Sequence, residues 1–190
     1  MTPRRELLLQ AAADLFASRG YHAVGIDDIG SAAGITGPGV YRHFASKQAL
    51  LEALCDRAMT RLLDLARAVP ASQQEPHAAL EALVEVHVDF AVVERDLLGV
   101  WAREQRALSG EVRRSLRDRQ RSYERVWRDV VSPLRDDLSS DEVAVAVGST
   151  LALINATALF DAKVPPDRLG LLLRRMSLSA LLARRIPTRS

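Results

Sequence analysis

The chain has 190 residues, of which 48% are hydrophobic and 26% are charged, so it can bury a substantial core and is not disordered throughout. Its 26 basic and 24 acidic residues leave a net charge of +2. This net charge says little about partners, because a DNA-binding protein requires only a local basic face. The single cysteine, Cys55, excludes an intramolecular disulfide and a cysteine-based metal cluster.

The pattern along the chain is helical from end to end. Leu and Ala recur while aromatic residues and glycine are sparse, a balance that favours helices over strands. Helix ends are indicated by stop signals at Gly20 and Gly34 and by N-caps at Thr36 and Ser46. We expect an all-α fold with about nine helices, covering residues 3–19, 26–33, 37–44, 47–69, 77–93, 97–107, 111–131, 140–160 and 168–185.

Two further signals divide the C-terminal part of the chain. The polar segment from Pro70 to Pro76 predicts a break between two helices, because proline cannot continue a helical hydrogen-bond ladder. Ser139 and Glu142 have the spacing of a capping box, which predicts a helix start at that point. Cys55 stands among apolar neighbours and is expected to be a buried packing residue.

The most informative stretch is IDDIGSAAGITGPGVYRHFASK, residues 26–47. Its first helix has an apolar face of Ile29, Ala32 and Ala33, and the small alanines allow the next helix to approach closely. Gly34 permits the sharp turn that sets two helices at a steep angle. The pattern indicates a helix-turn-helix whose second helix fits the major groove of DNA. The alternative is a helical hairpin without that function in a larger bundle.

The stretch resembles the TetR family of regulators. The similarity rests on VYRHFASK at the end of the short helix and on the upstream FASRGYHAVGIDDI, and it covers roughly the first 55 residues. It implies a DNA-binding domain over residues 1–50 and a larger helical ligand-binding and dimerisation domain over residues 51–190. It also implies a set of DNA-contacting residues: Tyr41 and His43 on phosphates, Thr36, Pro38, Gly39 and Arg42 facing the groove, and Lys47 holding the DNA backbone.

Two positions depart from the family pattern. Gly25 stands where members commonly have Ser or Thr, whose hydroxyl caps the second helix and meets a phosphate. Gly30 replaces the usual alanine, at a helix-propensity cost of roughly 1 kcal/mol. Both departures put individual contacts in doubt, but the motif as a whole still matches.

The larger domain contains a set of candidate ligand-contacting residues. His87 interrupts an apolar helical stripe, and Asn155 is a single polar residue within STLALINATALF. By the family resemblance, aromatic side chains on the corresponding helices line a ligand cavity. The candidate pocket residues are His87, Phe90, Trp101, Tyr123, Trp127 and Asn155. The competing interpretation is a histidine satisfied within the core and aromatic residues that only pack.

The last two helices are candidates for a dimer interface. Gly148, Ala152 and Ala156 recur every four residues and form a narrow ridge suited to close helix contact, and residues 168–185 are densely apolar. Pairing with the same helices of a second copy, as in the family, would make a homodimer. A homodimer also suits a palindromic double-stranded DNA operator.

These features predict a ligand-responsive transcriptional regulator, most simply a repressor that a small, largely apolar effector releases from its operator. An acyl-coenzyme A is one candidate effector, because Arg113, Arg117 or Arg121 could attract its phosphates. We expect no cofactor and no metal. The absence of a signal-peptide pattern and of about 18 uninterrupted apolar residues predicts a cytoplasmic protein outside the membrane.

Two other classes of function remain as alternatives. An enzyme is disfavoured because the sequence has no HExxH pattern, no Walker loop and no GxSxG elbow, and because His87 and Asp89 point in different directions on a helix. A helical interaction module that does not bind DNA is the other alternative. Turnover of a small metabolite would favour the enzyme, and the absence of sequence-selective DNA binding would favour the module.

Overall fold

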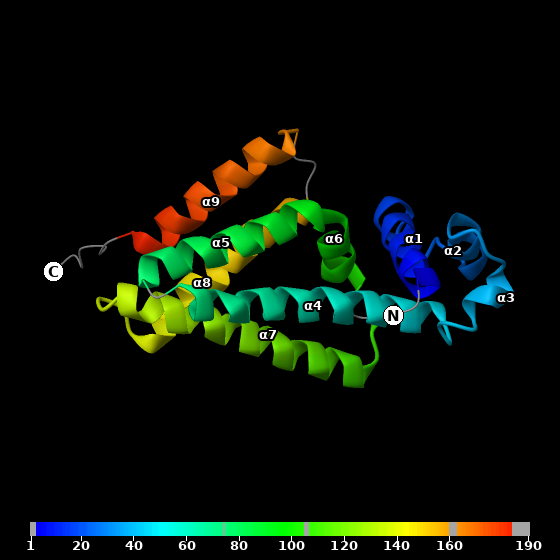
Figure 1. Ribbon diagram of the computed structural model, residues 1–190, viewed down its shortest axis with the longest axis horizontal. Helices are drawn as coiled ribbons and strands as arrows, with labels where there is room; N and C mark the ends of the chain where they lie inside the picture. The colour runs from blue at the N-terminus through cyan, green and yellow to red at the C-terminus, as the bar shows by residue number, and fades with distance from the viewer. Residues whose placement is uncertain (1–2, 74, 105–106, 160–162, 184–190) are drawn as a thin grey trace. The chain divides into compact units, whose positions relative to one another are not determined.

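The computed structural model describes residues 3–73, 75–104, 107–159 and 163–183. Within these residues the fold is all-α, as predicted, and contains nine α-helices (Figure 1). They are α1 (Pro3–Arg19), α2 (Ile26–Ala32), α3 (Gly37–Val40), α4 (Lys47–Ser72), α5 (Pro76–Val93), α6 (Arg95–Glu104), α7 (Gly110–Val131), α8 (Ser140–Asn155) and α9 (Pro166–Leu182).

The helices group into two compact units. Unit 1 comprises residues 1–60 and 94–118, and unit 2 comprises residues 61–93 and 119–190. Helices α4 and α7 each contribute residues to both units. The sequence-based boundary at residue 50 follows chain order, whereas the compact units are interleaved along the chain.

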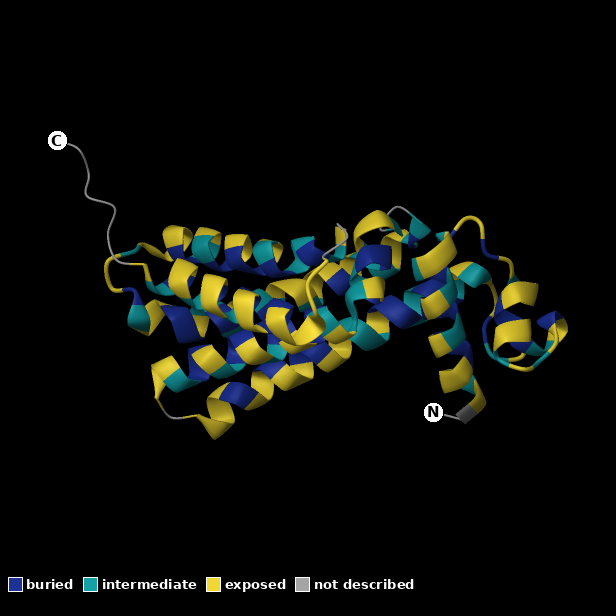
Figure 2. Cartoon of the chain, turned by 90° about the horizontal axis from the view of Figure 1, so that it is seen from above, coloured by how far each residue is buried: buried dark blue, intermediate teal, exposed yellow. Residues whose placement is uncertain are grey.

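The core of unit 1 forms where α1 packs against α2 and α6. Helical spacing places the apolar residues of a helix on one side, so the helices have a buried side and an exposed side (Figure 2). The fully or almost fully buried side chains include Leu8, Ala12 and Phe16 of α1, Ile29 of α2, Val40 of α3, Leu50 and Leu54 of α4, and Leu97 and Val100 of α6. Cys55 is also buried, as predicted.

Unit 2 is built around α5, which packs against α9 and α8, while α8 also packs against α9. The predicted capping box is present at the start of α8, where the Glu142 carboxylate accepts a hydrogen bond of 2.7 Å from the Ser139 amide. Arg135 fixes the C-terminal end of α9: its guanidinium donates to the Leu181 carbonyl at 2.7 Å and pairs with Asp137. These contacts satisfy groups that helix ends leave open.

Several helix ends differ from the sequence-based expectation, among them those of α3, α4 and α8. Helix α3 stops at Val40 and continues as a turn, and α8 stops at Asn155, where a 3₁₀ helix (Ala156–Leu159) takes over. The predicted break between Pro70 and Pro76 is present but shorter, because α4 runs through Pro70 to Ser72 and α5 begins at Pro76. Burial of Ala66 and Val69 holds that last turn, and the Gln73 amide bonds the Val69 carbonyl beyond the proline.

Residues Ser140–Leu159 have the length and mean hydropathy of a membrane span, although polar residues interrupt them. One-third of this segment is buried within the protein. Its buried side packs on α5 and α9, as expected of a core helix. Its other side carries exposed Val145 and Leu159.

Candidate functional site

The turn between α2 and α3 brings the two backbones unusually close. Gly34 adopts φ +69°, a left-handed conformation that favours glycine, and the Ile35 amide donates to the Gly30 carbonyl at 2.9 Å. A methyl group at Gly30 would lie 3.0 Å from the Ile35 oxygen and 3.2 Å from the Gly37 nitrogen. The glycine that departs from the family pattern therefore allows the close contact between these helices.

The residues around α3 divide into an anchoring set and an exposed set. Val40 and Phe44 are buried in the core of unit 1, and the Arg5 guanidinium lies 4.7 Å from the centre of the Phe44 ring. Four of the predicted DNA-contacting residues are exposed to solvent: Thr36, Pro38, Tyr41 and Arg42. Gly39 and His43 are half-buried beside them. The anchors thus hold a short backbone segment whose outward side chains are free to meet a ligand.

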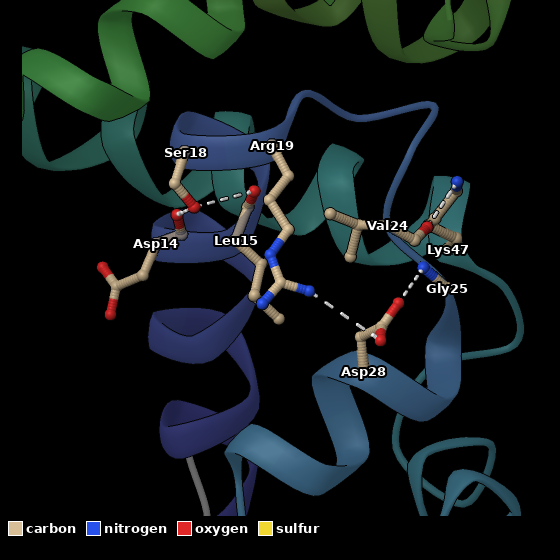
Figure 3. Close-up of polar contacts among 8 residues, drawn as sticks. All are labelled: Asp14, Leu15, Ser18, Arg19, Val24, Gly25, Asp28 and Lys47. Carbon is tan, nitrogen blue, oxygen red and sulfur yellow. Dashed lines mark hydrogen bonds and ion pairs between the residues drawn. The ribbon is translucent and has the colours of Figure 1, made fainter.

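The start of α2 is capped in an unexpected way (Figure 3). Gly25 has no side chain to cap the helix, but the Asp28 carboxylate accepts a hydrogen bond of 2.7 Å from the Gly25 amide. Arg19, at the end of α1, lies 4.0 Å from the same carboxylate. The acidic residue three positions after the N-cap was the available sequence signal.

Lys47 bonds within unit 1. Its ammonium donates to the Val24 carbonyl oxygen at 2.7 Å (Figure 3). It also donates to the Tyr21 carbonyl oxygen at 2.9 Å and lies 4.5 Å from the centre of the Tyr21 ring. Ser46 caps the same helix by accepting from the Ala49 amide, as predicted. The lysine therefore ties the start of α4 to the connection between α1 and α2.

Glu52 of α4 makes a second tie, which sequence reasoning missed. Its carboxylate accepts from the Ser109 amide at 2.8 Å, one residue before α7, and from the Gln48 amide group at 3.0 Å. Burial raises the pKa of Glu52, but the hydrogen bonds from Ser109 and Gln48 outweigh it and lower the pKa below its ordinary value. A carboxylate partner 57 residues away leaves no local sequence signal.

In unit 2, three of the predicted pocket residues form a buried cluster of rings. His87 of α5 shares a hydrogen bond of 2.7 Å between Nδ1 and the Tyr123 hydroxyl of α7. The Trp127 ring centre lies 6.0 Å from that of His87 and 6.2 Å from that of Tyr123. Only 2% of His87 is exposed, and Trp127 is fully buried. We call His87, Tyr123, Trp127 and the neighbouring Asn155 of α8 the interior polar cluster.

The interior polar cluster holds an uncharged histidine and several open polar atoms. Burial lowers the pKa of His87 to about 4, against the opposite effect of the neighbouring Asn155 side chain, so the ring is neutral at pH 7. Burial also raises the pKa of Tyr123 far above its ordinary value. Nε2 of His87, Nε1 of Trp127 and Oδ1 of Asn155 are buried without a hydrogen-bond partner.

The other two candidate pocket residues are placed differently. Phe90 is buried on α5 in unit 2 with the cluster. Trp101 belongs to unit 1, where it packs against the core. The structure therefore assigns five of the six candidate residues to unit 2 and one to unit 1.

Helices α8 and α9 each expose apolar residues to solvent. On α9, Leu171 and Leu172 are 53% and 49% exposed, and Met176 is also exposed. On α8, Val145 is exposed, and a methyl group at Gly148 would meet nothing within 4 Å. Ala152, from the same predicted ridge, is exposed as well. Exposed apolar side chains grouped on two helices that pack together are typical of surfaces that bind a partner.

Comparison with known proteins identifies families and structures that are similar to this chain. Residues 8–54 match the family of bacterial regulatory proteins of the tetR type, and residues 73–159 match the tetracyclin repressor-like C-terminal domain. A TetR-family transcriptional regulator from Bordetella parapertussis 12822 has a similar structure, with a TM-score of 0.83 and 25% identity over 98% of this chain and all of that one.

Two curated relatives are similar in sequence. The transcriptional activator FasR of Mycolicibacterium smegmatis is 38% identical over 96 residues, which span 50% of this chain and 43% of FasR. The transcriptional repressor KstR2 of Mycobacterium tuberculosis is 29% identical over 147 residues, which span 74% of each chain. The chain belongs to the TetR family, whose members are DNA-binding transcription regulators and not enzymes.

Proposed function

We propose that this chain is a ligand-responsive repressor that binds a palindromic operator as a homodimer in the cytoplasm and is released by a small, largely apolar effector. The observation that carries the proposal is the exposed set around α3, held in place by buried Val40 and Phe44. A short helix with a buried anchoring side and a solvent-facing polar side is suited to the major groove.

The exposed side chains suggest distinct roles in DNA recognition. Arg42 can read a guanine through two hydrogen bonds, and Tyr41 can donate to a phosphate. Thr36, Pro38 and Gly39 would lie toward the base edges, and His43 toward a phosphate. Lys47 is better suited to positioning than to DNA contact, because its ammonium already has two carbonyl partners.

Dimerisation would use the exposed apolar residues of α8 and α9. These surfaces would be covered by the same helices of a second copy, giving a two-fold interface. A dimer places two recognition segments on one face of the DNA, one helical turn or a multiple apart. The family of the chain supports this arrangement.

Effector binding in unit 2 would reduce DNA affinity through α4 and α7, since both helices contribute residues to both units. The ties made by Lys47 and Glu52 would carry the change to the segment around α3. The relative KstR2 is named a repressor, and its solved structure is described as that of a ketosteroid transcriptional regulator, which supports repression and an apolar effector. An acyl-coenzyme A stays a candidate, with Arg117 exposed on α7.

The proposal is tested by selecting binding sites from a pool of random double-stranded DNA with the full chain. The expected result is an inverted repeat whose half-sites are related by two-fold symmetry. The Arg42→Ala variant, checked for an unchanged melting temperature, should lose the preference at a matching base pair in each half-site. Recovery of no common sequence would contradict the proposal, and recovery of a single asymmetric site would contradict the homodimer.

A further inference from the structure

The interior of unit 2 gathers open polar atoms in one place. Five buried side-chain nitrogen or oxygen atoms of the described residues lack a hydrogen-bond partner, and three of them belong to His87, Trp127 and Asn155. These side chains come from three different helices, α5, α7 and α8. Buried polar atoms in proteins are almost always paired, so three open atoms in one cluster indicate a missing partner.

The chemistry of the three atoms defines that partner. The Trp127 indole can only donate, and the Asn155 carbonyl oxygen can only accept. Tyr123 keeps its proton and can donate it to Nδ1 of His87, which leaves a hydrogen on Nε2 of the neutral ring. Two donors and one acceptor are therefore open. A hydroxyl group, which accepts two hydrogen bonds and donates one, matches all three.

The surroundings favour a neutral partner over an anion. The His87 ring is uncharged at pH 7, and Arg174, a partly buried cation of α9, is already paired with Glu85 and Asp89. A carboxylate or phosphate in the interior would require an opposing charge. Most buried side chains of unit 2 are apolar, among them Phe90 and Ile154. They suit the hydrocarbon body of a ligand.

We propose that the interior polar cluster binds the hydroxyl group of a neutral, largely apolar effector, which accepts from Trp127 and His87 and donates to Asn155. This inference rests on the proposed function, in which unit 2 is the effector-binding part of the regulator. It specifies the buried end of the effector as an alcohol and excludes a free carboxylate at that position.

The test is calorimetric titration of the full chain at pH 7.5 with four probes of equal chain length: 1-octanol, 2-octanone, octanoate and 1-chlorooctane. We expect 1-octanol to bind about tenfold more tightly than 1-chlorooctane, 2-octanone to fall between them, and octanoate not to bind. The indole N–H resonance of Trp127, assigned by its loss in Trp127→Phe, should shift when 1-octanol is added.

Variants separate the hydrogen bonds from packing. Asn155→Leu should remove the preference for 1-octanol over 2-octanone, and His87→Phe should bring both probes to the affinity of 1-chlorooctane. Val143→Ala, a buried change on the same helix about 18 Å before Asn155, should weaken folding without changing the order of the probes.

Three results would overturn the inference: equal binding of all probes, tightest binding of octanoate, or no binding of any probe. Operator binding by the same preparation is measured separately. If selective DNA binding is retained and the alcohol preference is absent, this inference alone fails. If the alcohol preference is present and no DNA sequence is selected, the proposed function fails while the hydroxyl site stands.

Discussion

The segment around α3 and the interior polar cluster use polar side chains in opposite ways. Around α3, apolar anchors are buried and Tyr41 and Arg42 face the solvent, so their polar groups are satisfied by water. In the cluster, His87 and Trp127 are buried and keep open hydrogen-bonding atoms. Substituting the exposed side chains should change the free energy of unfolding little. The buried set is coupled to folding, so its partner must be matched closely.

The largest effect is expected from breaking the proposed dimer, which changes neither the segment around α3 nor the interior polar cluster. Leu171→Glu combined with Leu172→Glu places two charges on the exposed face of α9 and should produce monomers that remain helical. Operator affinity should fall at least about 100-fold, because the two half-sites are no longer bound together. Sedimentation analysis and anisotropy measure the two effects. Leu65→Glu, at a leucine of α4 with similar exposure, is the control. If the double variant stays dimeric, the assigned interface is contradicted.

The next effect tests the buried region through pH. The folded chain holds the pKa of His87 at about 4, below the ordinary value of about 6.5. Between these values the unfolded chain binds a proton that the folded chain does not, so the free energy of unfolding falls as pH decreases from 6.5 to 4, by about 3 kcal/mol in total.

Denaturant titrations at a series of pH values measure this loss. His87→Phe should remove it, whereas His77→Gln, at an exposed histidine near the start of the same helix, should leave it in place. Parallel stability curves for the wild type and His87→Phe would show that the ring is not buried in its neutral form.

A smaller effect tests whether Lys47 belongs with the exposed set. Lys47→Met removes two hydrogen bonds from a charged donor and should lower the free energy of unfolding by about 2 kcal/mol. The dependence of operator affinity on salt should keep its slope, because no phosphate contact is lost. A slope reduced by about 0.9 with unchanged stability would identify Lys47 as a phosphate contact instead.

The smallest effect concerns Gly25. The backbone at Gly25 allows a side chain, since φ is −91°, and a methyl group 3.3 Å from the Asp28 carboxylate would require that carboxylate to shift by a few tenths of an ångström. Gly25→Ser should add an N-cap that stabilises the fold by a few tenths of a kcal/mol and should tighten operator binding by about twofold. Gly25→Ala is the control without a hydroxyl. Equal affinity of the two variants would show that no phosphate lies at this position.

The two regions also differ in how far the sequence alone could predict them. The turn at Gly34, the Ser46 cap and the Ser139–Glu142 capping box depend on residues close in sequence, and all three are present as predicted. Candidate pocket residues His87, Tyr123 and Trp127 were chosen by type and spacing. That their rings meet depends on tertiary packing over 36 and more residues.

Two features that local rules do not give have the same physical origin. The break predicted from Pro70 to Pro76 starts only after Ser72, because burial of Ala66 and Val69 overrides the proline in the last turn of α4. The two hydrogen-bond partners of Lys47 are backbone carbonyls 23 and 26 residues earlier, and its predicted DNA contact stays a prediction. Partners at such distances leave no periodic signal in a single sequence.

The most direct test of the central claim is fluorescence anisotropy of labelled DNA from upstream of the chain's own gene, titrated at several salt concentrations. The wild type should bind tightly and should prefer this DNA to a scrambled sequence. The folded variant Tyr41→Ala combined with Arg42→Ala should lose that preference and bind both sequences weakly. Equal, weak binding of both DNAs by the wild type and the variant alike would contradict the assignment of the exposed residues around α3 as the DNA-reading surface.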